Sequence, residues 1–92
     1  MNKKLNNITR IQKFHDKQFK EHVVRHYKLL IRAAEQADDE TRLIRLNAQL
    51  EQIEAGNLSI AKHLTFIVDG SKLYYDEQQN KAVIDQIPYT VL

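Results

Sequence analysis

The feature that most constrains the fold is a long segment, residues 9–36, whose apolar and basic side chains separate onto opposite sides of an ideal helix. The apolar side consists of Ile8, Ile11, Phe19, Val23, Tyr27, Leu29, Leu30, Ala33 and Ala34. The basic side consists of Arg10, Lys13, Lys17, Lys20, Arg25, Lys28 and Arg32. Thr9 and Gln12 have the spacing of a capping box, which satisfies backbone donors at the start of a helix. We therefore predict a helix over residues 9–36.

A second amphipathic segment follows almost immediately. Asp38 and Asp39 are suited to cap it, and Gly56 is suited to the left-handed position that follows a helix. Between them lies a seam with the spacing of a coiled coil, made of Leu43, Leu46, Leu50 and Ile53. These signals predict a helix over residues 39–55. Because the connection is so short, the two helices must run antiparallel as a hairpin.

The last third of the chain favours strands, although a helical interpretation also exists. Apolar residues alternate along residues 64–68, and Asp69-Gly70 is a strong signal for a two-residue hairpin turn. In the helical interpretation, Ser59 caps one segment and Pro88 ends another. The β-branched and aromatic residues favour a β-meander within residues 63–87. We thus predict one α+β domain over residues 1–92, an antiparallel helical hairpin followed by a small antiparallel β-meander, with an all-α helical bundle as the alternative.

Charge is distributed unevenly along the 92 residues. Residues 1–36 carry nine Lys or Arg against three acids, whereas residues 37–92 carry five against nine. The N-terminal part is therefore suited to an acidic partner, to a polyanion or to the chain's own acidic half. The chain lacks cysteine, a secretory signal and any apolar run of the roughly 18 residues that cross a bilayer. We accordingly expect a cytoplasmic protein that does not enter a membrane.

The basic side of the first helix is the main candidate for partner binding. Its proposed contact residues are Arg10, Lys13, Lys17, Lys20, Lys28 and Arg32. An acidic protein surface is the expected partner, and nucleic acid is the alternative, because a row of cations can also follow a phosphate backbone. A solvated helix face would look much the same. Tyr74 and Tyr75 form a second candidate, because adjacent strand residues point to opposite faces and one must remain available to a partner.

Three histidines, His15, His22 and His26, fall within the apolar side of the first helix. His22 and His26 have the i, i+4 spacing that allows two imidazoles to share a metal ion, with further ligands coming from another chain. Histidines packed in a contact, or a pH-sensitive helix contact, explain the same pattern. We name His22 and His26 as the candidate metal ligands and expect no resident cofactor.

Sequence motifs for catalysis are missing. There is no cysteine nucleophile, no nucleophile elbow around either serine and no glycine-rich phosphate loop. We therefore expect a non-enzymatic interaction protein that binds and modulates another macromolecule, with a nucleic-acid-binding regulator as the alternative. Inhibitors and immunity-type proteins of phages or mobile elements are examples of the first class. Phe14, Val24 and Ile31 lie outside the apolar side. Together with the leucine seam of residues 43–53, they give the hairpin more apolar surface than one small sheet can cover, which predicts a symmetric homodimer.

Overall fold

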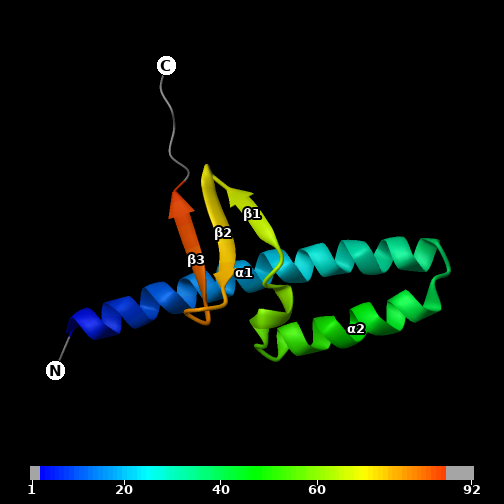
Figure 1. The fold of residues 1–92 in the computed structure, drawn as a ribbon, viewed down its shortest axis with the longest axis horizontal. Helices are drawn as coiled ribbons and strands as arrows, with labels where there is room; N and C mark the ends of the chain where they lie inside the picture. Colours follow the sequence, from blue (N-terminus) through cyan, green and yellow to red (C-terminus); the bar gives the residue numbers. More distant parts are fainter. Residues whose placement is uncertain (1–2, 87–92) are drawn as a thin grey trace, which may run out of the picture.

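The computed structural model describes the backbone of residues 3–86 and the side chains of residues 10–86. Two helices precede a three-stranded antiparallel sheet (Figure 1). The elements are α1 (Lys3–Gln36), α2 (Glu40–Glu54), the short 3-10 helix η1 (Leu58–Ala61), β1 (Thr65–Val68), β2 (Ser71–Asp76) and β3 (Lys81–Gln86). The predicted α+β fold is confirmed, and the all-α alternative is wrong. The last predicted strand residue, Ile87, lies outside the described residues.

Helix α1 begins at Lys3, six residues before the predicted start at Thr9. No glycine or proline interrupts residues 3–8, so nothing in the local sequence stops the helix there. The predicted capping box is wrong, because Thr9 is inside the helix and the Gln12 side chain donates instead to Asp16 and to the carbonyl of Ala82. With 34 residues, α1 is roughly 50 Å long.

Both ends of α2 follow the sequence signals. Asp39 is the N-cap, and its Oδ1 accepts a hydrogen bond from the Arg42 N–H at 3.1 Å. At the other end, Gly56 has φ +104°, and the amides of Gly56 and Asn57 donate to carbonyls of the last turn, as in a Schellman motif. Asp38, between the helices, also has a positive φ of 54°. The tight connection brings α2 back antiparallel to α1.

The sheet is a simple meander in the order β1-β2-β3. Asp69 and Gly70 both have positive φ, which gives the turn a twist matching that of the strands it joins. The register pairs Phe66 with Leu73 and places Leu73 opposite Ile84. At the second turn, the Asp76 carboxylate accepts hydrogen bonds from two backbone amides of the loop. Local chemistry therefore fixes both hairpins.

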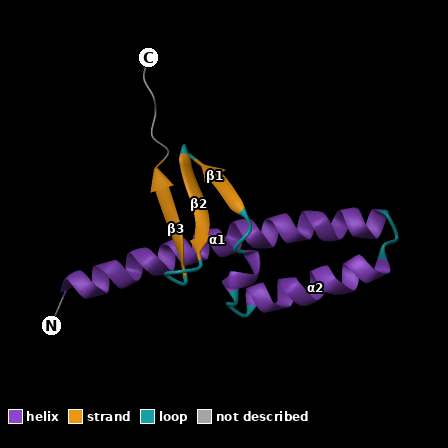
Figure 2. Cartoon of the chain, in the orientation of Figure 1, coloured by secondary structure: helices purple, strands orange, loops and turns teal. Residues whose placement is uncertain are grey.

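The core lies where α1 passes between the sheet and α2. Phe19 is fully buried, and its ring centroid lies 6.0 Å from those of both Phe66 and Tyr75. Ile53 of α2 and Leu73 of β2 are also fully buried. Figure 2 shows the sheet crossing the N-terminal half of α1, whereas α2 runs back along its C-terminal half. The sheet and α2 thus cover two different sides of α1, and a third side is left uncovered.

The molecule is elongated and thin. Its radius of gyration is 16.0 Å, and its extents are 52 × 45 × 20 Å. A compact domain of this length would have a radius of gyration of about 12 Å. Much of α1 therefore lies at the surface, where its side chains are accessible to a partner.

Candidate interaction surface

The flank of α1 that neither α2 nor the sheet covers is basic. Its exposed cations, which we call the basic surface, are Arg10, Lys13, Lys17, Arg25, Lys28 and Arg32. Within residues 10–86, the only ion pair joins Lys62 to Glu77, at 2.9 Å. Glu21 therefore makes no ion pair with Lys17 or Arg25, although it lies four residues from each. The cations of the basic surface therefore form no ion pair with the part of the chain that the structure describes.

Lys20 differs from the other predicted contact residues. It is half-buried, and its Nζ donates a 2.9 Å hydrogen bond to the carbonyl of Glu54 at the C-terminal end of α2. The last carbonyls of a helix lack intrahelical donors and carry partial negative charge, so a lysine is stabilising there. Lys20 thus ties α1 to α2, and we leave it out of the basic surface.

Two large apolar side chains are exposed next to these cations. Phe14 is 56% exposed, with Arg10 four residues before it and Lys17 three residues after it. These spacings place all three side chains on one helix face. Leu29 is 61% exposed and is flanked in the same way by Arg25 and Arg32. The uncovered flank therefore carries the same arrangement twice, an apolar side chain between two cations.

Two of the residues on which the predicted dimer rested, Val24 and Ile31, are used within the chain. Val24 and Ile31 are half-buried and pack against the core, so they present less surface to a second copy than the sequence suggests. Val24 also lines a hollow of about 530 Å³ between α1 and the end of α2, together with Lys17, Lys20, Glu21, Arg25 and Glu54. The leucine seam is also used within the chain, because Leu46, Leu50 and Ile53 are buried in the core and Leu43 packs against it. Self-association stays a prediction, for which Phe14 is the exposed residue.

Tyr74 and Tyr75 lie on opposite faces of the sheet. The Tyr75 ring faces α1 and contacts Phe19, and its hydroxyl bonds the Asn80 side chain. On the outer face, the Tyr74 hydroxyl donates to Asp85 at 3.0 Å. That hydrogen bond raises the pKa of Tyr74, whereas burial raises the pKa of Tyr75. Both rings are half-buried, so Tyr74 offers a partner only part of its surface.

The candidate metal ligands pack against the sheet. The ring centroids of His22 and His26 lie 5.4 and 6.3 Å from that of Phe66. His22 Nδ1 is 2.8 Å from the carbonyl of Gln18, so this nitrogen carries the proton that is donated. No group of three His, Cys, Asp or Glu side chains suited to a metal ion occurs among the described residues. His15 lies nearer the N-terminal end of α1, beside β3.

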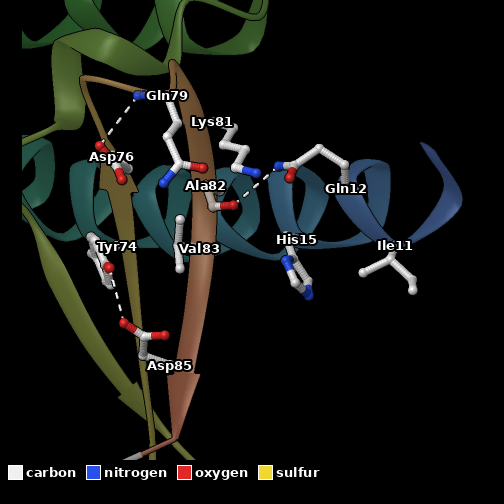
Figure 3. A pocket seen from close by; sticks show the side chains of 10 residues that line it. All are labelled: Ile11, Gln12, His15, Tyr74, Asp76, Gln79, Lys81, Ala82, Val83 and Asp85. Atoms are coloured by element: carbon white, nitrogen blue, oxygen red, sulfur yellow. Dashed lines mark hydrogen bonds between the residues drawn. The ribbon is translucent and has the colours of Figure 1, made fainter. Parts of the chain in front are cut away.

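A contact that the sequence did not suggest joins α1 to the backbone of β3. Asp16 Oδ1 accepts hydrogen bonds from the Ala82 N–H at 3.0 Å and from Gln12 Nε2 at 2.9 Å. Gln12 Nε2 also donates to the Ala82 carbonyl at 3.0 Å, as Figure 3 shows. The sequence did contain a signal for such a contact, because Gln12 and Asp16 are polar residues near the centre of the buried side of α1 and need hydrogen-bond partners there. What they would bind was not visible in the sequence.

The comparisons with known proteins are negative. None of the protein-family models, curated proteins or solved structures searched matches this chain. Within residues 3–86, no helix combines the length and the apolar character needed to span a bilayer.

Proposed function

We propose that the chain is a non-enzymatic interaction protein whose basic surface binds an acidic surface of another protein. The observation that carries this proposal is the uncovered flank of α1, where six exposed cations make no ion pair with any described residue. Like charges held on one rigid helix attract an anionic partner over distance and increase its rate of association. Binding would modulate the partner by occupying that acidic surface.

The exposed apolar residues favour a protein partner over nucleic acid. Phosphate contacts require only cations, whereas protein interfaces combine aromatic or aliphatic anchors with arginine at the centre of the contact. Phe14 and Leu29, each flanked by two cations, have this combination. They are 15 residues apart, so roughly 22 Å of helix separates the two anchors. An acidic partner with two apolar depressions at that spacing fits the surface.

The test is a combined charge reversal, Lys13→Glu, Lys17→Glu and Lys28→Glu, that leaves Lys20 in place. Surface substitutions of this kind change stability by about 0.5 kcal/mol or less each, so the variant should keep its circular dichroism spectrum. In a pull-down from the native host, followed by nuclease treatment, it should lose the partner that the wild type retains. The matched control, Arg42→Glu with Arg45→Glu, removes exposed cations from α2 and should retain that partner.

Phe14→Ala separates apolar anchoring from charge. If Phe14 fills a partner pocket, its removal weakens binding by about 1–2 kcal/mol and leaves the salt dependence unchanged.

Recovery of the same partner at wild-type yield by the triple charge-reversal variant would refute the proposal. Loss of the partner on nuclease treatment would support the alternative, a nucleic-acid-binding regulator, whose affinity would fall steeply with salt.

The remaining expectations are part of the same proposal. We propose a cytoplasmic location, because a chain without cysteine has no disulfide that would require an oxidising compartment. Inhibitors and immunity-type proteins of phages or mobile elements act by such small-protein contacts. A homodimer stays part of the proposal, and light scattering at tens of micromolar tests it, because the mass of one chain would exclude it.

A further inference from the structure

Strand β3 forms one edge of the sheet, and α1 covers only its beginning. The Ala82 N–H and C=O point away from β2, because both bind side chains of α1. Backbone groups alternate in direction along a strand, so those of Ile84 and Gln86 point the same way as those of Ala82. No described strand lies beyond β3 to pair with them. Among the residues that the structure describes, the second half of β3 is therefore an open edge.

A hollow of about 470 Å³ lies between α1 and the sheet, next to this edge, and on β3 its lining runs from Lys81 to Val83 and includes Asp85. Figure 3 shows Ile11 and His15 of α1 on one side of it, and Val83 and Asp85 on the side of the sheet. Ile11 is 55% exposed. The hollow thus offers apolar surface beside backbone donors and acceptors, which together suit an extended chain.

A second copy of β3 does not fit this edge well in an antiparallel arrangement. Placing Ile84 opposite itself would bring Gln86 of the second copy against Ala82, whose backbone groups Asp16 and Gln12 already occupy. Shifting by two residues places Asp85 directly opposite Asp85, at a Cα separation of about 4.5 Å, where like charges repel.

We propose that the open edge of β3 binds an extended segment of a partner protein as a fourth strand, with a lysine or arginine beside Asp85. No cation within the described residues forms an ion pair with Asp85, although Lys72 is its cross-strand neighbour. The Lys72 Nζ lies instead over the Tyr74 ring, 4.9 Å from its centroid. The segment alternates apolar residues, which face α1 and Ile11, with polar or basic residues on the outer face. This surface is separate from the basic surface.

The test uses a synthetic probe, acetyl-Val-Thr-Val-Lys-Val-Thr-Val-amide, titrated into the isotopically labelled protein to millimolar concentration. Backbone amide shifts should move at Ile84 and Gln86. Residues opposite Ile84 have side chains on the inner face, so the valine amides face β3. N-methylation of the valine amides should therefore abolish binding, whereas N-methylation of the threonine and lysine amides should leave it intact.

Charge provides the second arm of the test. Replacing the lysine of the probe with glutamate should weaken binding about fivefold, the factor that an exposed ion pair of roughly 1 kcal/mol gives. The Asp85→Lys protein should reverse that preference. The variant with reversed charges at Lys13, Lys17 and Lys28 should bind the probe as the wild type does.

Three results would overturn the proposal. The first is no shift at Ile84 and Gln86 at millimolar probe, and the second is an equal effect of the two N-methylation patterns. The third is concentration-dependent shifts at the edge without any probe, accompanied by the mass of two chains in light scattering. That third result would assign the edge to a second copy.

Discussion

Replacing Asp16 tests whether a side chain of α1 holds the first residues of β3. Asp16→Ala removes the acceptor for the Ala82 N–H, a hydrogen bond of 3.0 Å in a partly buried contact. It also releases Gln12 from its 2.9 Å hydrogen bond to the same carboxylate oxygen. Hydrogen bonds to a charged group contribute about 1.5–3 kcal/mol, and an unpaired backbone amide that is left behind adds its own cost. We expect the free energy of unfolding to fall by about 2 kcal/mol.

Asp16→Asn distinguishes the negative charge of the side chain from its hydrogen-bond geometry, because asparagine fills nearly the same space. Asparagine keeps one carbonyl oxygen at the position of Oδ1, so both hydrogen bonds can persist in a weaker, neutral form. The loss should then be under about 1 kcal/mol. Glu21→Ala is the matched control, because it removes an exposed carboxylate from the same helix, far from β3. It should change stability by no more than about 0.5 kcal/mol.

Urea denaturation followed by circular dichroism measures these differences, and hydrogen exchange reports on β3 itself. The Ala82 amide should exchange faster in Asp16→Ala than in the wild type, while amides of α2 change only as global stability does. A destabilisation of less than 0.5 kcal/mol for Asp16→Ala would refute the reasoning. An equal loss in Asp16→Ala and Asp16→Asn would show that charge, rather than hydrogen-bond geometry, holds the strand.

Three further predictions concern the rest of the fold. Burial raises the pKa of Tyr27 above its ordinary value of about 10, so stability should fall as pH rises past 10, and Tyr27→Phe should reduce that fall in circular dichroism measurements. Gly56→Ala should cost about 1–2 kcal/mol in urea denaturation because φ is +104°, although nothing lies within 4 Å of the added Cβ. Lys20→Met should cost about 0.5–1 kcal/mol in the same assay by removing the donor to Glu54, whereas Lys17→Met should be neutral.

Elements set by local chemistry could be predicted from the sequence. The separation of apolar and basic residues predicted α1, and the capping chemistry of Asp39 and Gly56 predicted both ends of α2. Asp69-Gly70 predicted the first hairpin turn, since these residues adopt positive φ readily. The predicted start of α1 was six residues too late, because Thr9 and Gln12 have the spacing of a capping box and the sequence does not show which groups the Gln12 side chain binds. A local motif of two residues is weak evidence when the helix can continue through it.

Contacts between distant segments were decided only by the tertiary structure. Gln12 and Asp16 bind Ala82, 70 and 66 residues away, and no local pattern specifies that pairing. In the sequence, Lys20 could not be distinguished from the other cations on the basic side of α1. In the structure it lies beside the end of α2 and donates a hydrogen bond to the Glu54 carbonyl. Periodicity shows which side of a helix avoids water but not which element covers it. The sequence therefore determined the two helices and the first hairpin turn and favoured strands after them, whereas packing determined which cation binds the end of α2 and which strand edge is left unpaired among the described residues.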